Sequence, residues 1–183
     1  MALRQVRLMG EDILKKKAKP VRNFDSVLHT LIDDMWDTLK ENDGLGLAAP
    51  QIGVLRRIIV IELEEDHFEL INPELLETTG MEVKSEACLS VPNKQGDVER
   101  PVWIRVGAVD RHGEYYEVET DDEMLATAIC HEMDHLEGIL FLDKAVNIQE
   151  RPDEEVVKAR HKQRNRGKRK KKHFKIKFGK EAV

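Results

Sequence analysis

The chain has 183 residues, of which 40% are hydrophobic and 5% aromatic, and this suffices for one ordinary globular core. Its formal net charge of −5 is unevenly distributed, because residues 158–183 contain 13 Lys and Arg but only one acid, Glu181. Two cysteines, Cys88 and Cys130, are too few for a disulfide framework. Residues 1–20 lack the apolar stretch of a secretory signal, and no apolar run approaches the roughly 20 residues needed to cross a bilayer. We therefore expect a soluble, cytoplasmic protein with no membrane association.

Residues 24–42 carry apolar side chains at intervals of three and four, as one face of an amphipathic helix requires. Asp25 or Ser26 is available to cap the start of this helix, and Gly44 follows as a stop signal. The apolar positions are Val27, Leu28, Leu31, Met35 and Leu39.

Between Arg57 and Glu119 the pattern changes to short β-rich runs that are separated by turn signals. The runs are RIIVIEL, HFELIN, MEVKSE, WIRVGAVD and EYYEVET, and the turn signals are Glu64–Asp66, Asn72–Pro73 and His112–Gly113. We expect mostly antiparallel strands in this part of the chain.

The residues Thr120-Asp121-Asp122-Glu123 match a capping box, in which the Thr hydroxyl and the Glu carboxylate bind free backbone N–H groups at a helix start. The helix should run from there to about Glu137, because Gly138 is a natural C-terminal stop. Apolar side chains cover more than half of its circumference, which predicts a central, buried helix. These side chains are Met124, Leu125, Ala128, Ile129 and Leu136.

After Leu142 the apolar content falls, and RNRGKRKKK is a charge run that has no core to join. The sequence therefore predicts one domain at residues 1–150 and a polar, strongly basic extension at residues 151–183. The predicted fold class is α+β, with short, mostly antiparallel sheets around a central helix.

This central helix carries His131-Glu132-Met133-Asp134-His135, which matches the pattern H-E-x-x-H. Residues four apart lie on one helical face, so both imidazoles can bind a single ion, and Glu132 then reaches a solvent ligand rather than the ion. Imidazoles suit Zn, Fe, Co and Ni alike, so the pair does not choose the metal. Cys130 should point about 100° away from His131, and we expect it to be a small buried side chain.

The third ligand decides the class of metal site. A metzincin would have a His where Phe141 stands, so that class is excluded. A thermolysin-like peptidase would use a downstream Glu, for which Glu150, Glu154 and Glu155 are candidates in a polar segment. Cys88 is the better donor, although a small buried hydrophobe is its alternative role. A metal-stabilised binding module is the non-enzyme alternative.

Three segments in order resemble the motifs of the peptide deformylase family. They are Gly44-Leu45-Gly46-Leu47-Ala48-Ala49-Pro50-Gln51, Glu86-Ala87-Cys88-Leu89-Ser90 and His131–His135. The resemblance extends from about Val6 to Val146. It implies a metal-dependent amide hydrolase that removes the formyl group from the N-terminal formylmethionine of nascent polypeptides.

The resemblance also implies the metal site and its chemistry. Cys88, His131 and His135 would bind one divalent ion, usually Fe(II) in this family, with Ni, Co or Zn as alternatives. A water molecule in the fourth position would be the nucleophile, and Glu132 the general acid and base. Gln51 and the backbone N–H of Leu89 would stabilise the oxyanion.

Two further expectations follow from the resemblance. Gly44, Gly46 and Ala87 would bind the substrate as an added strand. The family usually has Gly where this chain has Ala87, so the extra methyl group would either narrow the substrate cleft or require a compatible backbone angle. Residues 158–183 have two open interpretations: a flexible solubilising tail, or a segment that binds ribosomal RNA through phosphate contacts and through stacking by Phe174 and Phe178.

Overall fold

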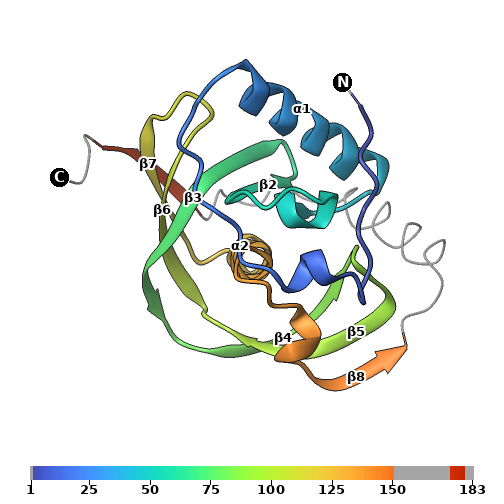
Figure 1. The fold of residues 1–183 in the computed structure, drawn as a ribbon. Coiled ribbons are helices and arrows are strands. Elements are labelled where there is room, and N and C mark those ends of the chain that lie inside the picture. The colour runs from blue at the N-terminus through green and yellow to red at the C-terminus, as the bar shows by residue number, and fades with distance from the viewer. Residues whose placement is uncertain (1, 151–173, 180–183) are drawn as a thin grey trace.

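The computed structural model describes residues 2–150 and 174–179, which form two antiparallel sheets around a central helix (Figure 1). The helices are η1 (Asp12–Lys15), α1 (Ser26–Glu41), η2 (Ala49–Ile52), α2 (Glu123–Leu136) and η3 (Phe141–Asp143). The strands are β1 (Gly46–Ala48), β2 (Ile58–Leu63), β3 (Asp66–Thr79), β4 (Glu82–Cys88), β5 (Val91–Arg100), β6 (Trp103–Val109), β7 (Tyr115–Thr120), β8 (Val146–Glu150) and β9 (Phe174–Phe178). The predicted α+β fold, with H-E-x-x-H on the central helix, is confirmed.

The larger sheet has the order β1-β2-β3-β6-β7-β9 and the smaller sheet has the order β4-β5-β8. Strand β3 is much longer than predicted, because Asn72–Pro73 is a bulge within it and not a turn. Asn72 has φ 52°, and its side chain binds the backbone N–H and C=O of Val21 at 2.8 and 2.9 Å. These bonds hold the bulged residue against Val21, which is 51 positions away in the chain, and the strand continues beyond the bulge to Thr79.

Strand β5 was missed, because its sequence VPNKQGDVER is rich in turn-forming and charged residues. It forms a hairpin with β4, in which Cys88 pairs with Val91 and Glu82 pairs with Arg100. The hairpin brings residues of both strands against the H-E-x-x-H segment, since Glu86 of β4 contacts His131 and Arg100 of β5 contacts Asp134.

Helix α1 begins as predicted, since the Asp25 side chain accepts hydrogen bonds from the N–H groups of Val27 and Leu28. Leu28, Met35 and Leu39 are buried, together with Ile32. The prediction was wrong for Val27, which is 75% exposed. Val27 lies in the first helical turn, about 100° around the axis from Leu28, so it faces solvent.

Helix α2 begins later than its predicted capping box. Asp122, not Thr120, accepts hydrogen bonds from the N–H groups of the first turn, while the Thr120 hydroxyl accepts from Asp122 N–H at 2.9 Å at the end of β7. Gly138 ends the helix as predicted, with φ 74°. A Cβ at Gly138 would lie 2.5 Å from the carbonyl oxygen of Lys15, so this position requires glycine.

Strand β9 was not predicted, although its sequence FKIKF alternates apolar and basic side chains. It pairs antiparallel with β7 at the end of the larger sheet. Phe174 packs edge-to-face on Phe68 with ring centroids 5.1 Å apart, while Lys177 forms an ion pair with Glu119. Part of the predicted basic extension therefore belongs to the sheet; residues 151–173 and 180–183 lie outside the described residues.

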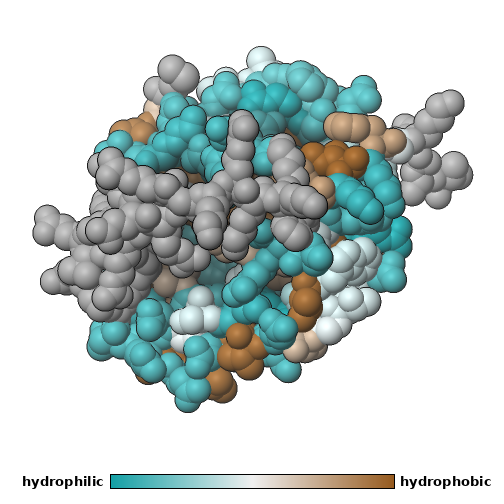
Figure 2. Space-filling view, turned by 180° about the vertical axis from the view of Figure 1, so that it is seen from behind, coloured by the Kyte–Doolittle hydropathy of each residue, from teal (hydrophilic) through white to brown (hydrophobic). Residues whose placement is uncertain are grey.

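Among the described residues, no helix is long and apolar enough to cross a membrane. Figure 2 shows the surface of the molecule from behind. The described residues on this face are largely hydrophilic, and their apolar side chains lie in separate spots. The apolar interior instead lies between the sheets and helices, with α2 against β1 and β2.

Candidate active site

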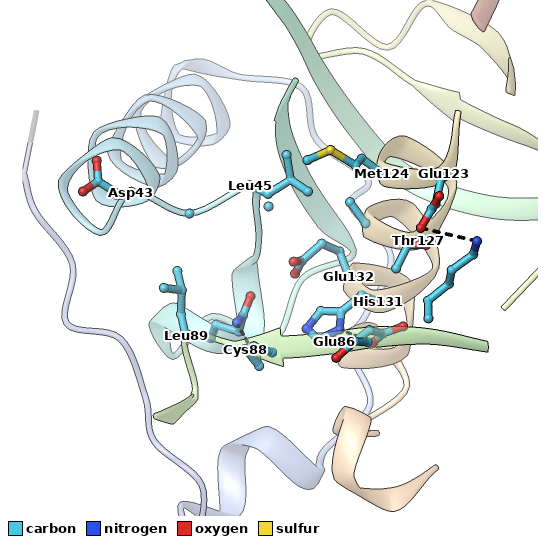
Figure 3. A pocket seen from close by; sticks show the side chains of 17 residues that line it. Asp43, Leu45, Glu86, Cys88, Leu89, Glu123, Met124, Thr127, His131 and Glu132 are labelled. Atoms are coloured by element: carbon cyan, nitrogen blue, oxygen red, sulfur yellow. Dashed lines mark hydrogen bonds and ion pairs between the residues drawn. The ribbon is translucent and has the colours of Figure 1, made fainter. Parts of the chain in front are cut away.

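A cavity of about 400 Å³ opens between β1, the end of β4 and helix α2 (Figure 3). In the close view His131 and Glu132 point from α2 toward this cavity, and Cys88 lies opposite them on β4. Leu45 and Met124 border the cavity, so its wall combines apolar and polar groups. Met124, predicted as part of the apolar core of the helix, is instead 39% exposed here.

The three predicted metal ligands come together at the base of this cavity. The ligand atoms of Cys88, His131 and His135 all lie within 4.8 Å of one another, and all three residues are buried. The Cys88 Sγ lies 3.2 Å from Nε2 of His135. Burial lowers the pKa of His135 well below its usual value, and the neutral imidazole is the form that binds a metal. One sulfur and two nitrogens at this spacing fit a single transition-metal ion.

Glu86 holds the ring of His131 in place. The Nδ1 of His131 lies 2.8 Å from Glu86 Oε2, and Arg100 donates to the same carboxylate at 2.5 and 2.9 Å. Burial alone would raise the pKa of Glu86, but the hydrogen bonds from Arg100 and His131 outweigh it and hold the pKa at about 2. Because an ionised carboxylate only accepts hydrogen bonds, His131 donates from Nδ1 and directs Nε2 toward the ligand cluster.

Sequence reasoning missed this supporting network. Arg100 also donates to Asp134 at 2.7 Å, which joins β4, β5 and α2 through one buried guanidinium. Glu86 and Asp134 lie inside the motifs named above, at positions expected to be buried. Because a buried charge needs a partner, these two carboxylates could have indicated such a network from the sequence. Arg100 lies on the unpredicted strand β5 and carried no such signal.

Glu132 directly follows the predicted metal ligand His131 on helix α2 and lines the cavity. Burial raises its pKa to about 7. Within the described part of the chain, its Oε2 is buried without a hydrogen-bond partner. A Cβ at Gly46 would lie 2.7 Å from Glu132 Oε1, so only glycine lets β1 approach the carboxylate this closely.

Gln51 presents its amide NH₂ to the ligand cluster. Its Oε1 accepts a hydrogen bond from Ala48 N–H at 2.7 Å, which leaves Nε2 within 3.5 Å of Cys88 Sγ and 3.3 Å of Ser90 Oγ. Leu89 follows Cys88 and lines the same cavity. The amide orientation is that of a hydrogen-bond donor aimed at the site.

The remaining predicted site residues are also near the cavity. Gly44, Gly46 and Ala87 line it, whereas His135 lies deeper and is 1% exposed. Gly44 has a packing role as well, since a Cβ there would lie 2.6 Å from Leu39 Cδ1. Cys130 is buried, and burial raises the pKa of its thiol to about 11, as expected for a small core side chain.

The structure does not support the thermolysin-like alternative. Glu150 is an exposed residue of β8 and is not part of the ligand cluster. Glu154 and Glu155 lie outside the described residues. Phe141, at the position where a metzincin would have its last His, stacks on His131 with ring centroids 6.2 Å apart.

A buried Cys-His-His set beside a cavity, with an adjacent carboxylate whose pKa is near neutral, defines the site of a metal-dependent hydrolase. The family model described as "Polypeptide deformylase" matches residues 3–151. The chain belongs to the peptide deformylase family, and it is a hydrolase that removes the N-formyl group from nascent peptides.

Relatives and solved structures agree with this assignment. A peptide deformylase of Thermoanaerobacter pseudethanolicus is 49% identical over 158 residues, covering 86% of this chain and 99% of the relative. A crystal structure of a peptide deformylase from Legionella pneumophila has a TM-score of 0.77 at 40% identity, covering 80% of this chain and 88% of that one. The Met-Ala-Ser-bound structure of a class I type b peptide deformylase from Acinetobacter baumannii has a TM-score of 0.75 at 35% identity, covering 78% and 98% of the two chains.

Proposed function

We propose that Cys88, His131 and His135 hold one divalent metal ion, Fe(II) in the cell, and that Glu132 moves the protons of the reaction. The convergence of these four buried side chains at one cavity is the observation that carries the proposal. The sulfur-and-imidazole donor set also accepts Ni, Co and Zn. When bound, the ion lowers the pKa of a water molecule and polarises the formyl carbonyl.

The protein side chains then supply proton transfer and charge stabilisation. Glu132 accepts a proton from the attacking water and later delivers a proton to the departing amine, which leaves formate and a free N-terminal methionine. The amide of Gln51 and the backbone N–H of Leu89 donate to the developing oxyanion, a role in which one donor contributes about 3 kcal/mol. The fixed orientation of the Gln51 amide supports this assignment.

The substrate peptide binds as an added strand along β1. Strand β1 pairs with β2 on one edge and is the terminal strand of its sheet, and residues Gly44 and Gly46 line the cavity beside it. Leu45, Leu89 and Met124 provide apolar surface for the methionine side chain, and Ala87 borders the same space. The tripeptide Met-Ala-Ser in the Acinetobacter baumannii structure has the sequence expected of such a product.

The basic extension, residues 151–183, is the part we propose to act in ribosome binding, while residues 1–150 form the catalytic domain. Thirteen Lys and Arg within residues 158–183 suit contacts with RNA phosphates. Phe174 packs on the sheet and Phe178 is 78% exposed, so Phe178 is the aromatic ring available for stacking. Binding there would hold the enzyme in the cytoplasm beside emerging nascent chains.

The experiment is formate release by protein purified anaerobically with Fe(II) or Ni(II). Formyl-Met-Ala-Ser is the substrate, and acetyl-Met-Ala-Ser and a blocked internal peptide are the controls. We expect release from the formyl peptide alone, abolished by chelation and by Cys88→Ala, which removes the sulfur ligand. Cleavage of the internal peptide with no release of formate would refute the proposal.

A further inference from the structure

The two proposed oxyanion donors come from segments that are far apart in the sequence. Gln51 belongs to η2, whereas Leu89 lies in the turn between β4 and β5. Donors of this kind act only when they are held close to the position that the oxyanion will occupy. The relative position of η2 and this turn is therefore a condition for catalysis.

Residues 7–9 connect the two segments through main-chain hydrogen bonds. The Arg7 N–H donates to the carbonyl oxygen of Gln51, and the Met9 N–H donates to the carbonyl oxygen of Ser90, each at 2.7 Å. Because a single residue separates the two donors, the short extended segment sets the distance between η2 and the β4–β5 turn.

Upstream, the same segment is tied to helix α1 by a buried carboxylate. The side chain of Asp34 is 2% exposed, and it accepts hydrogen bonds from Ala2 N–H at 2.7 Å and from the Arg4 guanidinium at 2.6 and 2.9 Å. The Arg4 N–H also donates to the buried hydroxyl of Thr38 at 3.0 Å. In Figure 1 this segment descends from the N-terminus past α1 toward η1. Asp34 and Thr38 are polar residues on a largely apolar face, and the segment supplies their partners.

We propose that residues 2–9 act as a strap that positions the oxyanion donors, so that Arg4 and Asp34 are positioning residues for deformylation although neither lines the cavity. The inference rests on the role proposed above for Gln51. Loosening the strap at its anchor lets η2 move relative to the β4–β5 turn. The loss then falls on the chemical step and not on substrate binding, because the substrate is bound along β1.

Arg4→Met and Asp34→Asn each break the anchor from one side. With metal-loaded enzyme and formyl-Met-Ala-Ser, kcat should fall roughly three- to tenfold while KM and metal content stay unchanged. Asp33→Asn is the matched control, because Asp33 lies on the same helix and pairs with Arg111 at 2.9 Å without contacting the strap. Arg4→Lys keeps the positive charge and should recover part of kcat.

A double-mutant cycle with Gln51 separates positioning from a general loss of stability. If the strap acts through Gln51, Arg4→Met should lower kcat much less in a Gln51→Ala background than in the wild type. Equal fold-losses in the two backgrounds would overturn the proposal, as would wild-type kcat for Arg4→Met. The Arg4 side chain is 44% exposed, so Arg4→Met carries the test where Asp34→Asn fails to fold. Wild-type kcat for Gln51→Ala alone would instead refute the role proposed for Gln51.

Discussion

At the scale of single residues, Glu132 differs from the other acids of helix α2 because it is buried and faces the cavity. Burial raises its pKa to about 7, and Gly46 leaves just enough room for its carboxylate. A carboxylate that titrates near neutral pH can both take and return a proton during one catalytic cycle.

Replacing Glu132 by Gln should therefore preserve metal binding and lower kcat by roughly a thousandfold, since Gln cannot carry the proton. Metal content by elemental analysis and formate release would be measured on the same preparation. Glu137→Gln is the control, because Glu137 caps the end of the helix and pairs with Lys17 and Arg57 outside the cavity. Activity of Glu132→Gln within tenfold of the wild type would contradict the assigned role.

Glu86 should make the stability of the metal-free protein depend on pH. Its pKa is about 2 in the folded protein against an ordinary value of 4.5, so the ionised form stabilises the fold above pH 4.5 and loses this effect as the pH falls toward 2. The difference in unfolding free energy between the wild type and Glu86→Gln should therefore shrink by about 2 kcal/mol between pH 5 and pH 3. Urea unfolding of both proteins at the two pH values measures this difference. An unchanged difference would show that Arg100 and His131 do not lower the pKa of Glu86.

At the scale of elements, β1 brings its backbone against the reacting carboxylate. Gly46→Ala should lower kcat at least about tenfold with the metal retained, because the new Cβ, 2.7 Å from Glu132 Oε1, must displace either the carboxylate or the strand. Gly179→Ala is the control, because its nearest contact would be an ordinary 3.7 Å to Tyr115. Equal kcat values for the two variants would mean that β1 can shift without consequence.

Strand β9 lies at the opposite end of the larger sheet from β1, the strand beside the active site. We therefore expect β9 to contribute to the stability of the fold and not to catalysis. Phe174→Ala removes the contact with Phe68 and should destabilise the protein by about 1–2 kcal/mol, which lowers Tm by roughly 3–6 °C. Formate release at 25 °C should not change. Phe178→Ala should have little effect on Tm because this side chain is 78% exposed; a similar loss in both variants would contradict the packing role of Phe174.

At the scale of the whole molecule, basic residues are concentrated in the C-terminal segment of a chain with net charge −5. Deleting residues 158–183 would remove β9 as well as the charge, so the two effects would be confused. Replacing the Lys and Arg of residues 164–172 by Gln keeps β9. This variant should bind ribosomes more weakly at low salt, with unchanged hydrolysis of formyl-Met-Ala-Ser. Co-sedimentation with ribosomes at two salt concentrations tests the prediction, and equal binding by both proteins would reject it.

The sequence by itself determined those features that depend on local spacing or on motifs. Residues four apart lie on the same face of any helix, so the spacing of His131 and His135 places both imidazoles on one side of α2. The helix cap at Asp25 and the helix stop at Gly138 act through neighbouring backbone groups. Cys88 was the better candidate for the third ligand, and the resemblance assigned that role to it and a role in catalysis to Gln51, although no periodicity in the chain connects either residue to the helix. In the structure the ligand atoms of Cys88, His131 and His135 lie within 4.8 Å of one another, and Gln51 lines the cavity beside them.

Only the tertiary structure decided the contacts between segments that are distant in the chain. The pairing of Arg100 with Glu86, the approach of Gly46 to Glu132 and the strap at residues 2–9 each join elements that local propensity treats separately. Strands β5 and β9 were missed for the same reason. The sequence of β5 is rich in turn-forming and charged residues, and the short alternating FKIKF of β9 stands in a strongly basic segment. Both become strands because β4 and β7 supply paired backbone groups and a surface to pack on.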